Sequence, residues 1–326
     1  MPVRSSLIKI SLYALLIITA GLSAISPFLW DYPFELLSNF RVYYLILAGG
    51  IAIAFFICHL SKRCSQLPIY LALALVAFNS AWIFPWYLPS FSTGTDSDNT
   101  IRVLTFNINI SNTEWDNIAT AIREVDPDVA AIVESTDETK NALDERLRDL
   151  YPIVYRTTGG GLTLLSKREL LSADSKIFDS GTVLTATLQT EKGPVELLAA
   201  HPIVPIKPST FPRRNALLAD ITTYLVDQPE SSHILLGDFN LTPWSPYYNR
   251  LIKKTGLHNT RKGFGIHPTW LESSPYSGYS KLLSLFLQLP IDHIFVTRDI
   301  GVADFDTREA ANADHRMVWA DLSLSS

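Results

Sequence analysis

The sequence predicts an α+β fold for the larger, C-terminal part of the chain, behind an N-terminal region that spans a membrane. The first 90 residues contain three long uncharged stretches. From residue 101 onward, patterns typical of strands and of helices mix without strict alternation. Such a mixture fits a layered architecture with strands inside and helices outside. Polar residues stand at the ends of several predicted strands, which indicates that one edge of a sheet carries a site.

The apolar stretches are long enough to cross a bilayer, because about twenty residues of helix span roughly 30 Å of hydrocarbon. They cover residues 10–30, 42–60 and 67–88. A buried core helix or a cleaved signal peptide would explain one such stretch, but the apolar core of a signal peptide holds only about 7 to 15 residues. We therefore expect a three-helix membrane anchor at 1–90, a polar linker at 91–100 and a C-terminal domain at 101–326.

The distribution of Lys and Arg predicts the orientation of this anchor, because short cytoplasmic loops are enriched in both. Arg41 alone lies between the first two spans, whereas the other side carries Arg4, Lys9, Lys62 and Arg63. The N-terminus is thus expected in the cytoplasm. Three crossings then place the C-terminal domain outside the cytoplasm, in a multi-pass protein of the cell inner membrane.

The positions of the cysteines and of the charged residues indicate which bonds and which binding partners to expect. Both cysteines, Cys58 and Cys64, belong to the anchor, where we expect ordinary unpaired thiols. Residues 91–326 carry 22 of the 27 basic and 30 of the 32 acidic residues, a formal charge of −8. Stable nucleic-acid binding is not expected of such a domain, since affinity for phosphates rests largely on positive charge.

The elements expected from residue 101 begin with an alternating strand at 101–110 and an amphipathic helix at 115–125. Further helices are expected at 140–150 and 214–226. Further strands are expected at 129–133, 162–165, 183–189, 195–200, 233–236, 291–296 and 317–322. Gly159 to Gly161 invites a phosphate-loop interpretation, but no Gly-Lys-Ser/Thr follows, so entry to a strand or hairpin is favoured.

The strongest chemical signal is the segment 233–240, His-Ile-Leu-Leu-Gly-Asp-Phe-Asn. Asp238 and Asn240 follow a buried strand and lie two residues apart, so they point to the same side. A carboxylate and an amide held there can position and activate a water molecule. A turn at the strand end is the alternative, since Gly, Asp and Asn all favour turns.

Two Asp-His pairs follow, at 292–293 and 314–315. Asp292 is a suitable carboxylate to orient His315, because a carboxylate bonded to one ring nitrogen fixes the tautomer and stabilises the imidazolium. Asp314 is a candidate metal ligand beside it.

A third signal comes from Asn107 and Glu134, which end the first two strands. Glu134 ends a wholly apolar run, where a charge is costly unless it is paired or binds a metal. Oxygen ligands of this kind suit Mg²⁺ or Mn²⁺ better than Zn²⁺.

Taken in order, these motifs resemble the endonuclease/exonuclease/phosphatase superfamily over about residues 100 to 323. The motifs are Thr-Phe-Asn-Ile at 105–108, Glu134, Leu-Leu-Ser-Lys at 164–167, His201, Gly-Asp-Phe-Asn at 237–240, Ile-Asp-His-Ile at 291–294 and Ala-Asp-His-Arg at 313–316. The resemblance implies a four-layer α/β sandwich of two packed mixed sheets flanked by helices. The segments His-Pro at 201–202 and Pro-Thr-Trp at 268–270 resemble those of a membrane-anchored bacterial branch of this superfamily.

The resemblance also implies roles for the residues at matching positions. Glu134 is the expected principal Mg²⁺ ligand, with Asn107 and Asp314 as its neighbours in the metal site. Asp238 is expected to orient or deprotonate the attacking water, helped by Asn240, while His315 (supported by Asp292) and His201 are expected on the phosphate side. The chain departs from the family at Asn109, where some members have an acid, at Val133, where many have Gln, and at Pro202.

Two further features have both a structural and a functional interpretation. Arg213 and Arg214 begin a predicted helix and are candidate substrate-binding residues, because guanidinium groups match phosphate geometry, although a solvated helix start is the alternative. The apolar segment 281–289 is either a helix that covers the core or a lip that touches a bilayer.

The sequence thus predicts Mg²⁺-dependent (or Mn²⁺-dependent) hydrolysis of a phosphate ester. A phosphodiester is favoured, with a lipid-linked substrate consistent with the anchor. A nuclease acting on DNA or RNA and a non-catalytic membrane binding module are the alternatives.

Overall fold

The computed structural model describes residues 2–89, 100–191 and 193–324. The chain divides into two compact units, of which the first ends at Tyr87 and also contains Pro243–Pro246, while the second holds the remainder. The linker expected at 91–100 lies outside the described residues except for Thr100.

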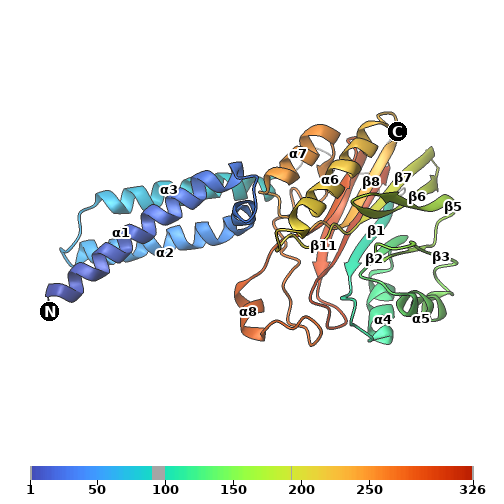
Figure 1. The fold of residues 1–326 in the computed structure, drawn as a ribbon, viewed down its shortest axis with the longest axis horizontal. Coiled ribbons are helices and arrows are strands. Elements are labelled where there is room, and N and C mark those ends of the chain that lie inside the picture. Colours follow the sequence, from blue (N-terminus) through green and yellow to red (C-terminus); the bar gives the residue numbers. More distant parts are fainter. Residues whose placement is uncertain (1, 90–99, 192, 325–326) are drawn as a thin grey trace. The chain divides into compact units, whose positions relative to one another are not determined.

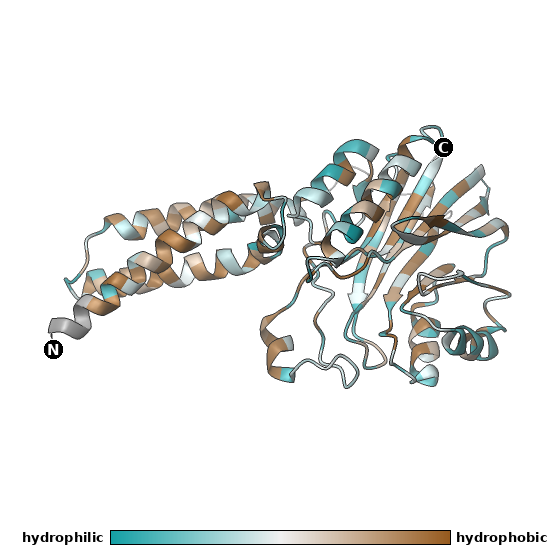
Figure 2. Cartoon of the chain, viewed as in Figure 1, coloured by the Kyte–Doolittle hydropathy of each residue, from teal (hydrophilic) through white to brown (hydrophobic). Residues whose placement is uncertain are grey.

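The first unit consists of three long apolar helices, α1 (Pro2–Ile25), α2 (Arg41–Leu60) and α3 (Leu67–Ile83). Short 3₁₀ helices extend them: η1 (Ser26–Phe28), η2 (Phe34–Phe40) and η3 (Phe84–Trp86). The helices pack through a small core of side chains such as Ala48, Ile51 and Phe55. Many other apolar side chains of these helices are exposed, and Figure 2 colours the helices mostly brown, the colour of hydrophobic residues. All three predicted spans are therefore helices long and apolar enough to cross a bilayer.

A polar cluster lies among these helices. Arg41 is fully buried and donates through Nη1 to the Ser23 carbonyl at 2.7 Å and to Asn79 Oδ1 at 3.0 Å. Trp244, in the distant segment that belongs to this unit, donates from its indole to the Trp82 carbonyl at 3.3 Å. Such contacts satisfy polar groups that would be costly in hydrocarbon.

The expectation of unpaired thiols is wrong, because Cys58 and Cys64 form a disulfide with a Cα–Cα distance of 5.4 Å. The chain turns back at the end of α2, where the Arg63 N–H donates to the Cys58 carbonyl at 3.0 Å. This turn returns the second cysteine to the last turn of the helix, which spacing along the sequence alone did not reveal.

The second unit contains two six-stranded mixed sheets. The first has the order β11-β12-β1-β2-β4-β3. Its strands are β1 (Thr100–Asn107), β2 (Val129–Val133), β3 (Ile153–Arg156), β4 (Leu162–Ser166), β11 (Ile300–Arg308) and β12 (Met317–Leu324). The second has the order β5-β6-β7-β8-β10-β9. Its strands are β5 (Leu170–Phe178), β6 (Gly181–Thr190), β7 (Gly193–Ala200), β8 (Ser232–Asp238), β9 (His258–Asn259) and β10 (Asp292–Val296).

Helices flank the two sheets on their outer sides (Figure 1). They are α4 (Trp115–Val125), α5 (Asp137–Leu147), α6 (Thr210–Val226) and α7 (Pro246–Thr255), whereas the short α8 (Lys281–Phe286) stands at the edge of the domain. Alternation along β1 explains the layering: Ile101 and Val103 point into the core between the sheets, while Leu104 and Phe106 pack under α4 and α5. The four-layer sandwich and the α+β class are confirmed.

The predicted strands and helices are present with shifted ends. The first strand stops at Asn107 rather than at residue 110, because Asn109 adopts a left-handed conformation with φ 68°. The helix expected at 214 begins at Thr210. Strands β3, β5, β9 and β11 and helix α7 were not predicted; β5 in particular is mostly exposed and lacks a clear apolar face.

Candidate active site

The polar residues meet because strands from both sheets end at the same place. In the first sheet, β1 and β2 run parallel with Asn107 paired to Val133, so Glu134 follows directly beside Asn107. In the second sheet, β8 pairs antiparallel with β10 so that Asp238 lies opposite Asp292. β7 runs parallel to β8 and pairs Ala200 with Gly237, which brings His201 to the same edge.

Gly237 makes this arrangement possible. Its φ is +140°, and a Cβ on it would lie 2.0 Å from the Ala200 carbonyl oxygen. No side chain fits at that distance, so the close approach of β7 and β8 just before Asp238 requires glycine.

We expect Gly237→Ala to lower the melting temperature by roughly 10 °C or more, because the new methyl group would force the two strands apart. Gly193→Ala is the matched control: its φ is also positive (+115°), but nothing lies within 4 Å. The control should show only backbone strain, about 1–3 kcal/mol. Equal losses in the two variants, measured by thermal unfolding, would contradict the clash.

Asn107 lies at the centre of the site and contacts three of its side chains. Its Nδ2 donates to Glu134 Oε1 and to Asp238 Oδ2, both at 3.1 Å, and lies 3.5 Å from His315 Nε2. The other carboxylate oxygen of Glu134 accepts from the Ile110 N–H at 2.8 Å. A fully buried amide therefore links side chains from both sheets.

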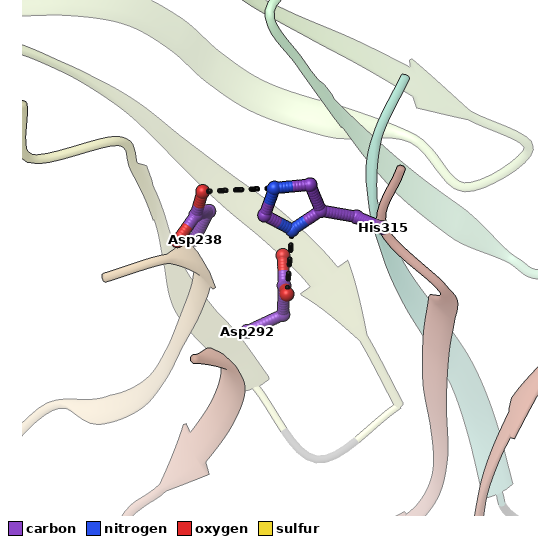
Figure 3. A group of neighbouring side chains, drawn as sticks. All are labelled: Asp238, Asp292 and His315. Atoms are coloured by element: carbon purple, nitrogen blue, oxygen red, sulfur yellow. Dashed lines mark hydrogen bonds and ion pairs between the residues drawn. The ribbon is translucent and has the colours of Figure 1, made fainter. Parts of the chain in front are cut away.

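Asp238, His315 and Asp292 form a buried chain of charges (Figure 3). His315 Nδ1 lies 2.9 Å from Asp292 Oδ2, and its Nε2 lies 3.7 Å from Asp238 Oδ2. Thr269 supports the chain by accepting from the Asp292 N–H through its hydroxyl at 3.2 Å. The imidazole is thus fixed by one carboxylate and directed at the other.

The environment separates the pKa values of these groups. Burial raises the pKa of Asp238 to about 6, and the nearby charge of Asp292 adds to the rise. Burial alone would lower the pKa of His315, but the charges of Asp292 and Asp238 overcome it and raise the pKa to about 10. Burial opposes ionisation of Asp292, yet the His315 ring and its hydrogen bond bring that pKa below its ordinary value. Near neutral pH, Asp238 is an available base and His315 a cation.

A pH profile follows from these directions. Activity should fall as pH drops below about 6, where Asp238 takes up a proton and ceases to be a base, and again above about 10, where His315 loses its positive charge. The measurement is kcat/KM against pH. Activity that increases as pH falls through 6 would contradict the assignment of Asp238 as the base.

Backbone conformation holds two more residues in place. Glu134 and Asn240 have φ values of 59° and 51°, a left-handed region in which a residue other than glycine costs of order 1–3 kcal/mol. Asn240 is held by its N–H, which donates to Asp238 Oδ1 at 2.9 Å, and by its side chain, which donates to the Pro202 carbonyl at 3.0 Å. Such local strain is typical of functional sites.

His201 and Asp314 complete the cluster. His201 Nε2 lies 3.8 Å from Glu134 Oε1 and 3.6 Å from Asp238 Oδ2. Asp314 is linked to the rest through Asn109, whose Nδ2 donates to Asp314 Oδ1 at 3.1 Å. The family acid absent at position 109 is thus replaced by an amide that holds Asp314.

These groups open into a cleft with a volume of about 480 Å³. Its walls combine the polar cluster with apolar and aromatic side chains. The lining residues are Asn109, Glu134, His201, Ile203, Val204, Asp238, Asn240, Trp270, Ser277, Tyr279, Asp314 and His315. Asn107 and Asp292 lie buried behind them.

Residues 104–315 match the Endonuclease/Exonuclease/phosphatase family. The chain belongs to this family. It is therefore a hydrolase that acts on ester bonds. No curated protein matches the sequence closely enough to be reported as a relative.

Solved structures of the endonuclease/exonuclease/phosphatase fold resemble the second unit at low sequence identity. Sphingomyelinase C from Streptomyces griseocarneus is 14% identical with a TM-score of 0.54, over 68% of this chain and 99% of that chain. An endonuclease/exonuclease/phosphatase protein from Beutenbergia cavernae is 19% identical with a TM-score of 0.55, over 70% and 72%. Truncated Caenorhabditis elegans TDP2 is 17% identical with a TM-score of 0.54, over 69% and 97%. At these identities the likeness establishes the shared fold.

The structure brings together all the predicted catalytic and metal-binding residues but places neither predicted substrate-binding arginine among those that line the cleft. Arg214 is fully buried; it stacks on Phe211 and Tyr247 and donates to the Asn240 carbonyl at 3.1 Å. The phosphate contact predicted for Arg214 is therefore wrong for this structure. Because α6 begins four residues earlier than predicted, Arg214 turns inward and supports Asn240 from behind. Arg213 is exposed, which agrees with the alternative interpretation of a solvated helix start.

Sequence reasoning missed the apolar and aromatic walls. Ile203, Val204, Ser277 and Tyr279 carry no motif and lie on irregular segments, and Trp270 had been noted only as part of a branch signature. The signal that came nearest was the apolar segment 281–289, which follows Tyr279 and was interpreted as a helix that covers the core or as a lip.

Two groups of side chains have the chemistry to hold a metal ion. Donor atoms of Asp238, Asp292 and His315 all lie within 4.8 Å of one another. However, both ring nitrogens of His315 are already directed at carboxylates, Nδ1 at Asp292 at 2.9 Å and Nε2 at Asp238 at 3.7 Å, which makes the ring a poor metal ligand. Glu134 lies at the cleft wall, 3.1 Å from the Asn107 amide, which would offer its oxygen on turning, and we regard this side as the better fit for a hard cation.

Proposed function

We propose that this protein hydrolyses a phosphodiester with the help of a divalent cation, in a domain tethered to a membrane. The observation that supports this most directly is the buried Asp238–His315–Asp292 chain, which faces a cleft also lined by Glu134. The three parts of this assignment are the proton transfers, the cation and the substrate.

In the proposed mechanism, Asp238 accepts the proton of a water molecule in the cleft, and the water oxygen attacks phosphorus. The leaving oxygen departs opposite the new bond and takes up a proton from solvent. Protonated His315 stabilises the charge that develops on the phosphoryl oxygens, while Asp292 keeps the imidazolium oriented. Asn240 and His201 lie where they can hydrogen-bond a phosphate group.

The proposed cation is Mg²⁺ (or Mn²⁺), with Glu134 as its principal ligand and Asn107 and Asp314 as neighbours. Carboxylate and amide oxygens are the donors that these ions prefer. For Asn107 to ligate through oxygen, its amide must turn, because Nδ2 now faces Glu134. When bound, the cation would polarise the phosphoryl oxygens.

The substrate class is proposed from charge and location. The formal charge of −8 on residues 91–326 disfavours nucleic acid, whereas three apolar helices favour a membrane-associated substrate. One structural neighbour is a sphingomyelinase, which by its name acts on a membrane lipid. The family name keeps a nuclease as the second candidate. A non-catalytic binding module is disfavoured, because the side chains proposed for catalysis line one cleft or lie buried next to it.

A substrate screen tests the proposal. The purified full chain should cleave bis-p-nitrophenyl phosphate and phospholipid in Mg²⁺ or Mn²⁺, and cleave duplex DNA and phosphomonoesters much more slowly. Faster cleavage of DNA would establish the nuclease instead. No cleavage of any substrate, by protein that remains folded, would support the binding module.

We also propose that the chain is a multi-pass inner-membrane protein with its catalytic domain outside the cytoplasm. A reporter fused after Ser326 tests the topology. Alkaline phosphatase should be active and green fluorescent protein dark, because the charge rule keeps Lys62 and Arg63 inside. The reverse pattern would place the catalytic domain in the cytoplasm. The loop that carries Lys62 and Arg63, with the Cys58–Cys64 disulfide, would then lie in the oxidising compartment, where disulfides persist.

A further inference from the structure

Two exposed apolar segments border the cleft. One follows His201 and includes Val204 and Ile206; the other runs from Tyr279 into α8 and includes Leu282, Leu285 and Phe286. Val204 and Tyr279 themselves line the cleft. We call these six side chains the apolar rim.

The rim is not packed against the domain. Leu285 is 69% exposed, Phe286 68% and Leu282 64%, although α8 is well formed, with Ser280 capping its N-terminus by accepting from the Leu283 N–H. α8 stands at the edge of the domain and is coloured as strongly apolar (Figure 2). The alternative expected from the sequence, a helix that covers the core, is therefore wrong for α8. Contiguous exposed apolar side chains around a site are typical of a surface that contacts a membrane or a partner.

Charge distinguishes the rim from the rest of this acidic domain. Residues 202–219 contain no Asp or Glu and three basic residues, Lys207, Arg213 and Arg214, of which Arg214 is buried. Residues 273–291 contain no acid and one base, Lys281 at the start of α8. Apolar side chains interspersed with cations and free of acids match the interface of a bilayer that contains anionic lipids.

We propose that the apolar rim inserts into the bilayer interface and thereby presents the phosphate of a phospholipid to the cleft. The proposal rests on the phosphodiesterase function above and deepens it by naming the substrate as a lipid within the bilayer. The anchor keeps the domain at a bilayer surface, so the rim has an apolar medium within reach. Val204 and Tyr279 belong to both the rim and the cleft wall, so they would contact a lipid whose phosphate has entered the cleft.

The first test is a measurement of depth that does not depend on activity. The full chain carrying an environment-sensitive fluorophore at Leu285→Cys is reconstituted in nanodiscs of phosphatidylcholine and phosphatidylglycerol, with or without spin-labelled lipids. Ile177→Cys is the matched control, because Ile177 is 67% exposed but lies on the edge strand β5. Emission at 285 should shift to the blue and be quenched by spin-labelled lipid, and emission at 177 should do neither. A blue shift without lipid quenching would show that protein covers the rim, and would overturn the proposal, as would no shift at all.

The second test compares two substrates. Leu285→Ser with Phe286→Ser should lower the ratio of phospholipid hydrolysis to bis-p-nitrophenyl phosphate hydrolysis by roughly tenfold or more, since each buried apolar side chain contributes to binding. Ile177→Ser should leave that ratio unchanged. An unchanged ratio in the rim variant would overturn lipid presentation. Failure of the wild-type chain to cleave the soluble diester would instead refute the phosphodiesterase function, and the depth measurement would still decide whether the rim inserts.

Discussion

Asp238→Asn should lower kcat for a phosphodiester by roughly 10² to 10⁴, because an amide cannot accept the proton of the attacking water. The substitution conserves shape, and the Asn240 N–H still finds an oxygen acceptor at this position. We therefore expect the fold to survive, as judged by circular dichroism and thermal unfolding. The measurement is kcat at saturating substrate and excess Mg²⁺.

Asp174→Asn is the matched control, since Asp174 is an exposed carboxylate on β5 and should not affect the rate. A folded Asp238→Asn protein with a near-normal rate would show that another group activates the water. If Asp238→Asn does not fold, His315→Ala becomes the informative substitution. We expect His315→Ala to lower kcat by the same factor, roughly 10² to 10⁴.

Glu134→Gln should weaken cation binding by roughly 10²-fold, because it removes the negative charge from the proposed principal ligand. Activity at limiting Mg²⁺ should fall in proportion and be partly restored at high Mg²⁺. EDTA should abolish the activity of the unmodified chain, and Mg²⁺ or Mn²⁺ should restore it. Binding of Mn²⁺, measured by calorimetry or electron paramagnetic resonance, gives a readout independent of turnover.

Glu138→Gln, an exposed glutamate on α5 four residues later, serves as the control and should bind Mn²⁺ normally. Normal binding in Glu134→Gln would move the cation to the other candidate group, Asp238, Asp292 and His315. Full activity in EDTA would refute the cation requirement altogether.

The fold could be predicted where a pattern of apolar residues runs along a single strand or helix. Alternation in β1 identified which residues face which core, and the apolar run of β2 marked a strand that ends at Glu134. The polar residues that end such strands were found for the same reason, since a charge after a buried run requires a partner. Asn107, Glu134, Asp238 and Asp292 lie together because parallel and antiparallel registers bring those strand ends to one edge.

What could not be predicted depends on contacts between distant segments. Arg214 turns inward because α6 begins at Thr210 and because Phe211 and Tyr247 offer it aromatic faces, a fact of packing rather than of pattern. The disulfide depends on a turn after α2, and the aromatic wall of the cleft depends on Trp270 and Tyr279 in irregular chain. The inward turn of Arg214, the disulfide and the aromatic wall leave no periodic pattern in the sequence.

In the proposed mechanism, water activated beside Asp238 attacks phosphorus. Mass spectrometry of the products of bis-p-nitrophenyl phosphate hydrolysis, in water enriched in ¹⁸O and with Mg²⁺ present, tests this step. We expect one ¹⁸O atom in the p-nitrophenyl phosphate formed in a single turnover and none in the released p-nitrophenol. Label in the p-nitrophenol would show cleavage of the carbon–oxygen bond, and would contradict attack at phosphorus.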